Sequence, residues 1–151
     1  MGETKNYIRW IRGKVGHDKV ILAFAGGYIR NEKDEILLQR RGDSNLWSFT
    51  GGAIELGETP EMTAIREAKE ETGLDVEVVR LAGIYTDTDM VYPNGDQAHS
   101  IMIVYELRAV GGELYCDRDE TLELRYFSKD ENPAFFSRQH EKLWRELTGR
   151  K

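Results

Sequence analysis

The sequence has almost no cysteine, and no long apolar run. Its single cysteine, Cys116, excludes an internal disulfide and is typical of a reducing compartment. We interpret Cys116 as a small strand residue rather than a nucleophile. No apolar stretch approaches the roughly 18 residues that a membrane helix needs, and the first residues do not form a signal peptide. The expected location is therefore the cytoplasm, with no membrane partner.

Positive charges are outnumbered by negative ones. The chain has 21 Lys and Arg against 27 Asp and Glu, a formal net charge of −6, so a nucleic-acid-binding surface is not expected. A phosphate substrate is still allowed, because local arginines and a metal ion decide that. His17 and His99 lack Cys or His partners at zinc spacing, which argues against a zinc site. At 151 residues and 40% hydrophobic content, residues 1–151 are predicted to form one domain.

The stretch from Gly52 to Leu74 carries the strongest local signals. Pro60 suits the first turn of a helix, and Thr59 before it can cap the helix N-terminus. Gly73 is a natural left-handed residue at a helix C-terminus. Together these residues predict a helix over 60–72.

The side chains of this predicted helix divide into two faces. The face expected to be buried carries Met62, Ala64, Ile65 and Ala68. Glu67, Glu70 and Glu71 are expected close together on nearly the opposite face. Like charges at this spacing repel by a few tenths of a kcal/mol per pair. The cluster is therefore either a solvated acidic face or a set of oxygen ligands for a hard cation such as Mg²⁺.

The residues around the helix favour the cation. Gly51 and Gly52 allow a tight turn in which a backbone carbonyl could face a metal ion. Glu58 precedes the helix and can reach back to Arg66, which is also one turn from Glu70. Arg66 would then hold acidic side chains in position.

The stretch resembles the Nudix box, G-x5-E-x7-R-E-U-x-E-E-x-G-U, where U is aliphatic. It matches every fixed position if Ala68 is accepted as U. The matching residues are Gly52, Glu58, Arg66, Glu67, Ala68, Glu70, Glu71, Gly73 and Leu74. The resemblance implies the Nudix fold, an α/β/α sandwich with a mixed central sheet. It also implies Glu67, Glu70 and Glu71 as metal ligands, joined by the Gly52 carbonyl, with Glu58 and Arg66 as orienting residues.

Three elements are predicted before the box. Residues 5–15 have helical spacing and form a helix that either covers the sheet or contributes to a homodimer contact. The apolar run 20–29 is a buried strand, with a bulge or a close backbone approach at Gly26 and Gly27. A turn at 31–34 leads to a returning hairpin strand over 35–41.

The strand over 35–41 ends with two arginines. Strand-end arginines are commonly solvated, but in the Nudix resemblance basic residues here face the entering phosphates. Arg40 and Arg41 are therefore candidate substrate contacts, and strand alternation sends one to each face. The following loop, 42–49, has Trp47 as its expected anchor. Thr50 stands where family members commonly have proline, which should alter loop stiffness without touching metal binding.

Strands are predicted over 75–84, 99–109 and 113–116. Between the first two, residues 85–96 form either a plain hairpin loop or a substrate-selecting loop. In the second interpretation Tyr85 and Tyr92 stack on a base or sugar.

The polar loop 117–121 precedes a strand over 122–128. Many Nudix enzymes supply a further carboxylate here, and Glu120 matches best in position, followed by Glu123. The alternative is that Glu120 is a solvated loop charge. Asn132 and Pro133 then predict the start of a final helix. The apolar stripe of that helix is Phe136, His140, Leu143, Trp144 and Leu147, ended by Gly149, with His140 expected to pack rather than to bind a ligand.

The implied activity is a Mg²⁺-dependent pyrophosphohydrolase, with Mn²⁺ as an alternative ion. Water attacks a phosphorus of a nucleoside diphosphate derivative of the ADP-ribose, nucleotide sugar or nucleoside triphosphate type. Glu67, Glu70 and Glu120 are the candidate catalytic carboxylates, one of which takes the proton. Two alternatives stay open, a non-catalytic nucleotide-sensing module and an RNA 5′ pyrophosphohydrolase.

Overall fold

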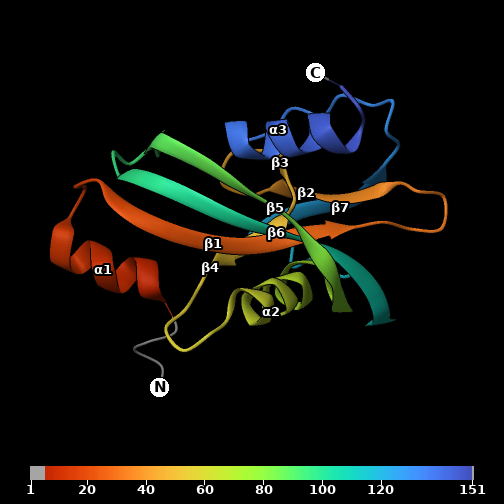
Figure 1. Cartoon of the computed structure of the whole chain (residues 1–151), viewed down its shortest axis with the longest axis horizontal. Coiled ribbons are helices and arrows are strands. Elements are labelled where there is room, and N and C mark those ends of the chain that lie inside the picture. The colour runs from red at the N-terminus through yellow and green to blue at the C-terminus, as the bar shows by residue number, and fades with distance from the viewer. Residues whose placement is uncertain (1–5, 151) are drawn as a thin grey trace.

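The computed structural model describes residues 6–150 and has three layers (Figure 1). Helix α3 (Arg138–Leu147) lies on one side of the strands, and helix α2 (Pro60–Thr72) lies on the other. The predicted α/β/α arrangement is therefore confirmed. A further helix, α1 (Tyr7–Val15), lies at one end of the molecule beside the start of β1.

The strands form two sheets rather than one. The four-stranded sheet has the order β4-β1-β6-β5 and is mixed, because β1 pairs parallel to β6 while the other pairs are antiparallel. Its strands are β1 (Val20–Ile29), β4 (Thr50–Ala53), β5 (Leu74–Val91) and β6 (Gln97–Gly112). The three-stranded antiparallel sheet has the order β3-β2-β7. Its strands are β2 (Ile36–Arg41), β3 (Trp47–Ser48) and β7 (Thr121–Phe127).

Strand β2 was expected to return alongside β1 as a hairpin, and that expectation is wrong. The bridge between Arg30 and Ile36 begins such a pairing, but β2 then forms its ladders with β3 and β7. The chain crosses from one sheet to the other at this point. As a result, the end of β2 meets the start of β7 rather than the four-stranded sheet.

The close backbone approach predicted at Gly26 and Gly27 is confirmed. A Cβ at Gly26 would lie 2.0 Å from the Thr50 carbonyl oxygen, and one at Gly27 would lie 2.3 Å from that of Tyr105. Only hydrogen fits at both positions. The two glycines let β4 and β6 flank β1 closely, which places Gly51 and Gly52 of the edge strand β4 opposite Gly26 and Ala25 of β1.

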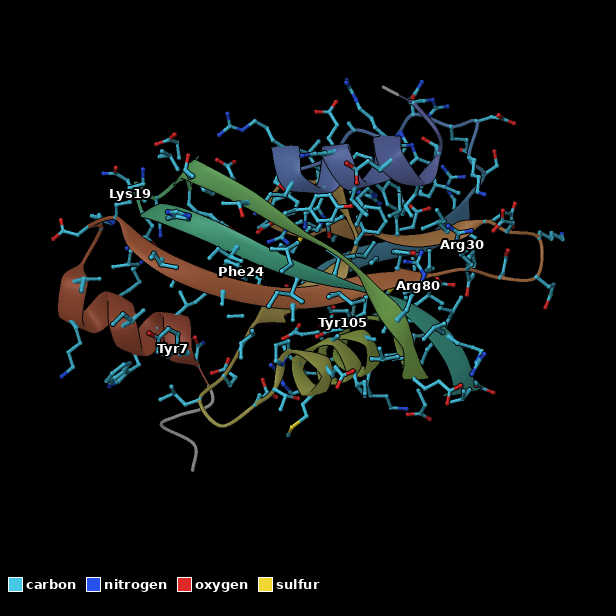
Figure 2. All side chains as sticks on the ribbon, in the orientation of Figure 1. Tyr7, Lys19, Phe24, Arg30, Arg80 and Tyr105 are labelled. Carbon is cyan, nitrogen blue, oxygen red and sulfur yellow. The ribbon has the colours of Figure 1, made fainter. Side chains whose placement is uncertain are left out.

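Two apolar clusters join the layers. One lies on the α3 side and includes Leu143 and Trp144, which are fully buried. The other lies on the α2 side, where Tyr105 packs between the sheet and the helix (Figure 2). Small residues of α2, Ala64 and Ala68, complete this second cluster and allow the helix to approach the sheet closely.

Helix α3 begins later than predicted, at Arg138 instead of Asn132–Pro133. Its N-cap is Ser137, whose hydroxyl accepts a hydrogen bond from the His140 amide. The preceding residues are held in a strand-like bridge, because Trp47 donates to the Ala134 carbonyl and accepts from the Phe136 amide. Backbone groups used in that bridge are not available to a helix.

Strand β5 extends to Val91 and β6 begins at Gln97, so the loop expected over 85–96 is only residues 92–96. Tyr85 lies within β5, is 8% exposed, and donates its hydroxyl to Glu146. It therefore packs in the core, and its expected role in stacking on a substrate is wrong. The turn signal at 93–96 does coincide with the observed turn.

The short strand predicted over 113–116 is also absent, and these residues are irregular. Gly112 has a φ of 77°, which ends the extended strand. The Tyr115 amide then donates to the Thr72 carbonyl at the end of α2. This segment closes the C-terminus of α2 instead of adding a sheet edge.

Helix α1 has Asn6 as its N-cap, and Lys5, which the prediction included, lies outside the described residues. Arg12 ties the helix down by donating to the carbonyls of Gly16, Asp18 and Gln97. No residue of α1 is buried, and Trp10 is 47% exposed. The dimer contact stays a prediction. Within residues 6–150, no helix has the length and apolar character needed to cross a membrane.

Candidate active site

Helix α2 has the bounds and caps that its sequence predicts. The Thr59 hydroxyl accepts a hydrogen bond from the Met62 amide at 3.2 Å. At the other end Gly73 is left-handed, with a φ of 80°, and its amide donates to the Lys69 carbonyl. These caps fix where the acidic side chains of the helix project.

The buried face of α2 differs from the prediction. Ala64 and Ala68 are fully buried as expected, but Met62 is 51% and Ile65 is 39% exposed. The helix packs against β1, β4 and β5 with its small residues, and the same inward side carries acidic residues. The packing of small side chains against glycine-rich strands decides the orientation, rather than apolar content.

Glu67 and Glu71 therefore point inward, toward the glycines of β4. The Gly51 amide donates to Glu71 Oε1 at 2.9 Å. A Cβ built on Gly52 would lie 2.5 Å from Glu67 Oε2, so the glycine leaves the space that this carboxylate fills. The role of the Gly52 carbonyl as a metal ligand stays a prediction.

The two inward carboxylates are poorly stabilised as anions. Burial raises the pKa of Glu71 well above its ordinary range, and the neighbouring charge of Glu67 adds to the effect. Burial also raises the pKa of Glu67, against the hydrogen bond from Arg66. Two desolvated carboxylates side by side present only oxygen donors and excess negative charge, which is a donor set that fits a hard divalent cation.

Glu70 lies apart from this pair. Its side chain is 58% exposed and accepts from Arg66 Nη1 at 3.3 Å. Across residues 6–150, no three acidic, histidine or cysteine side chains converge closely enough to form a metal site as they stand. The structure thus brings two of the three predicted ligands together and directs the third outward.

Arg66 makes the contacts that its orienting role requires. Its Nε and Nη2 donate to the two carboxylate oxygens of Glu58 at 2.6 and 2.9 Å, a two-pronged pair, and Nη1 donates to Glu67 at 2.7 Å. The Arg66 hydrogen bonds lower the pKa of Glu58 to about 2. Glu58 also accepts from the Thr63 hydroxyl at 2.8 Å. Arg66, itself bound to Glu58, therefore holds the side chain of Glu67 in place through this hydrogen bond.

A cavity of about 400 Å³ opens beside Glu71. Strand β2, helix α2 and the loops at 42–43 and 119–120 form its walls. The lining residues are Gln39, Arg41, Gly42, Asp43, Glu71, Asp119, Glu120 and Thr121. The structure therefore brings together Glu71, Arg41 and Glu120, which lie far apart in the sequence.

The two arginines at the end of β2 separate as alternation predicts. Arg41 lines the cavity, donates to Asp43 at 2.9 and 2.7 Å, and places its guanidinium 4.0 Å from the ring centre of Phe136. Arg40 instead donates to Glu123 and does not line the cavity. Arg41 is thus better placed than Arg40 to meet a substrate, and Glu123 serves as the partner of Arg40.

The loop that carries Glu120 is fixed by backbone contacts. Asp117 Oδ1 accepts from the amides of residues 119, 120 and 121 at 2.9, 3.2 and 3.3 Å. The Gly42 amide donates to the Glu120 carbonyl at 2.8 Å, and a Cβ on Gly42 would lie 1.9 Å from the Asp119 carbonyl oxygen. Glu120 itself is exposed on the cavity wall.

Tyr92 is half-buried near the charge of Arg41. Burial raises the pKa of its phenol, while the charges of Arg41 and Arg12 oppose that rise. Tyr92 does not line the cavity, and its role as a substrate contact stays a prediction.

Sequence reasoning missed Gln39 and Thr121, which are 3% and 4% exposed. The Thr121 hydroxyl donates to Gln39 Oε1 at 2.7 Å. The available signal was a polar residue that follows the apolar run Ile36–Leu38 of a buried strand. His140 is packed as expected, since its Nδ1 accepts from the Phe49 amide and burial lowers its pKa to about 3.

Comparison with known proteins gives consistent matches. A family model described as the NUDIX domain matches residues 22–147. An ADP-ribose pyrophosphatase of Methanocaldococcus jannaschii is 34% identical over 119 residues, 78% of this chain and 67% of that protein. A putative 8-oxo-dGTP diphosphatase of Bacillus subtilis is 32% identical over 107 residues, 71% of this chain and 66% of that protein. The matched part thus spans about two thirds of these relatives.

A solved structure gives a similar result. The crystal structure of an ADP-ribose pyrophosphatase from Streptococcus suis superimposes with a TM-score of 0.63 and 26% identity. The match covers 84% of this chain and 91% of that one.

Proposed function

This chain belongs to the Nudix family of hydrolases, and on that premise we propose that it is a Mg²⁺-dependent pyrophosphohydrolase of a nucleoside diphosphate derivative. The observation that carries the proposal is the charge of the cavity wall. Its lining includes one guanidinium, Arg41, and four carboxylates. These carboxylates are Asp43, Glu71, Asp119 and Glu120. Such a wall repels a bare diphosphate, so the substrate must enter together with divalent cations.

Glu67, Glu70 and Glu71 are the residues that would hold the cation, with the Gly52 carbonyl as a further oxygen. Mg²⁺ suits this all-oxygen set, and Mn²⁺ is the alternative ion. When bound, such an ion supplies charge compensation for the phosphates and lowers the pKa of the attacking water. Arg66 keeps Glu67 in place, because it is itself locked by both oxygens of Glu58.

The remaining roles follow from position in the cavity. Arg41 binds a phosphate oxygen of the substrate through its guanidinium, which Phe136 and Asp43 already orient. Glu120, on the loop before β7, accepts the proton of the attacking water. Attack at phosphorus breaks one P–O bond of the diphosphate bridge, and the two products each leave with one phosphate group.

The substrate is best sought among nucleoside diphosphate derivatives. ADP-ribose comes first because two of the similar proteins are named ADP-ribose pyrophosphatases. Nucleotide sugars and nucleoside triphosphates follow. A triphosphate carries more negative charge than a diphosphate bridge, while the wall offers a single arginine, so we expect a diphosphate bridge to be preferred.

The test is a substrate panel with identified products. Each compound is incubated with the protein in Mg²⁺, in Mn²⁺ and in chelator, and products are separated by chromatography. Metal-dependent formation of two monophosphates from ADP-ribose is the expected result. Binding of a nucleotide without turnover in either metal would favour the non-catalytic sensing module. Turnover of 5′-triphosphorylated RNA alone would favour the RNA 5′ pyrophosphohydrolase.

A further inference from the structure

Two buried residues outside the family motif connect the carboxylates on opposite walls of the cavity. We propose that Gln39 and Thr121 are a positioning pair that fixes the separation between Glu71 on α2 and Glu120 on the loop before β7. The inference rests on the proposed function, because the two carboxylates have assigned roles in that function. It adds two residues that neither the motif nor its resemblance identifies.

The amide of Gln39 has one orientation that satisfies its neighbours. Its Nε2 donates to the Phe49 carbonyl at 3.4 Å, two residues before Gly51, whose amide donates to Glu71 Oε1 at 2.9 Å. A carbonyl only accepts hydrogen bonds, so the amide nitrogen must be on that side. The Oε1 atom is then left to accept from the Thr121 hydroxyl at 2.7 Å. The side chain of Gln39 is thus fixed at both ends.

Thr121 transmits this constraint to the opposite wall. It directly follows Glu120, and the Asp117 carboxylate accepts from the amides of both residues. The Gly42 amide holds the Glu120 carbonyl at 2.8 Å, immediately beyond the end of β2. Displacing Thr121 from Gln39 would therefore displace Glu120 with it.

The pair also links the three-stranded sheet to the part of the fold that carries the acidic helix. Gln39 belongs to β2 and Thr121 to β7, which are neighbours in the three-stranded sheet. Glu71 belongs to α2, which packs on the four-stranded sheet. Gln39 is therefore tied to the segment 49–51, whose Gly51 amide holds Glu71, and these contacts keep the two halves of the cavity at one spacing. Such outer contacts typically change activity by roughly 10- to 100-fold when they are removed.

Thr121→Val tests the proposal because it keeps the shape of the side chain and removes the donor. We expect the turnover number of the substrate found by the panel to fall roughly 10- to 100-fold, with KM changed less than about threefold. Thr121→Ser, which restores a hydroxyl, should recover most of the turnover. The pair Ser100 and Gln139 offers a matched control, since Ser100 donates to Gln139 at 3.2 Å, is buried, and does not line the cavity. Ser100→Ala should leave turnover within about threefold of the original.

A second measurement does not depend on turnover. Mg²⁺ should raise the thermal unfolding midpoint of the unsubstituted protein, and the rise should be smaller in Thr121→Val. If Thr121→Val folds poorly, the double variant Gln39→Met with Thr121→Val replaces both polar partners and serves for both measurements. Unchanged turnover together with an unchanged Mg²⁺ response, in whichever variant folds, would overturn the positioning role. If the unsubstituted protein turns over no compound of the panel, the proposed function fails instead. The difference in the Mg²⁺-induced rise of the unfolding midpoint between the variant and the original protein then tests the positioning of Glu71 by itself.

Discussion

Replacing Gly52 with alanine should separate the chemistry of the site from the stability of the fold. Gly52 is not among the glycines with positive φ, so its backbone accepts a side chain without strain. The added Cβ would lie 2.5 Å from Cδ and Oε2 of Glu67. The neighbour it meets is the end of a flexible side chain and not backbone, so Glu67 rather than β4 should move.

The size of the effect follows from that contact. Ordinary contact begins at 3.4 Å, so the carboxylate must retreat by about 3.4 − 2.5 = 0.9 Å. A misplacement of about 1 Å at a reacting centre lowers the rate by about 100-fold, or about 2.7 kcal/mol in the barrier. The free energy of unfolding should change by less than about 1 kcal/mol, because alanine also restricts the unfolded chain.

The assay compares turnover, the Mg²⁺ requirement and urea unfolding across three glycine variants. Gly13→Ala is the neutral control, since no atom lies within 4 Å of its new Cβ. Gly26→Ala is the structural control, because its Cβ would lie 2.0 Å from the backbone oxygen of Thr50 and should prevent folding. If Gly52→Ala kept the original turnover and Mg²⁺ requirement, Glu67 could not be the metal ligand that we assign.

Three further predictions concern single side chains. Glu70→Gln should cut turnover by several orders of magnitude with unchanged urea unfolding, and near-full Mg²⁺-dependent activity would remove Glu70 from the site. Burial lowers the pKa of His140 from 6.5 to about 3, so only the unfolded state gains its proton as pH falls below about 6.5. His140 should therefore cost the fold about 1.4 kcal/mol per pH unit from pH 6 to pH 4. His140→Asn, which retains an acceptor for the Phe49 amide, should lose this dependence of stability on pH. If the free energy of unfolding of the original protein, measured in urea, changed with pH no more than that of the variant, the lowered pKa of His140 would be contradicted. Glu58→Gln should destabilise the fold by about 1–3 kcal/mol at pH 7 and less near pH 2, because the stabilisation from a carboxylate of pKa about 2 is lost as pH falls from 4.5. Equal destabilisation of that variant at both pH values would argue against the ion pair with Arg66.

Local signals in the sequence were sufficient to predict the bounds of helix α2, which ends at capping residues on both sides. Thr59, Pro60 and Gly73 act within one helical turn, so they fixed the bounds of α2 without reference to the rest of the chain. The predicted start of α3 was wrong because the helix-start signal at Asn132 and Pro133 competes with a β-bridge between Phe135 and Trp47. Trp47 lies 135 − 47 = 88 positions earlier in the chain. A contact between residues so far apart in the sequence cannot be predicted from the residues next to either one.

The candidate site was only partly predictable for the same reason. The glutamates of α2 were recognisable from their spacing, but which of them face inward depends on how close the helix lies to β4. Apolar content suggested that Met62 and Ile65 are buried, whereas the glycines of β4 admit Glu67 and leave those two residues exposed. Gln39 was missed because its partner Thr121 comes from a strand with no sequence relation to β2.

The division into two sheets suggests a way to redesign the specificity of the protein. Residues 42–46 connect β2 to β3, and residues 117–120 lead from β6 into β7, while the glutamates and glycines proposed for the cation belong to α2 and β4. A combinatorial library confined to those two loops, with Gly42, Asp43, Asp117 and Glu120 retained, would vary molecular recognition and leave the proposed ion-binding and proton-accepting residues intact. Directed evolution toward a new nucleotide could therefore start from these loops and accumulate changes without first losing catalytic competence.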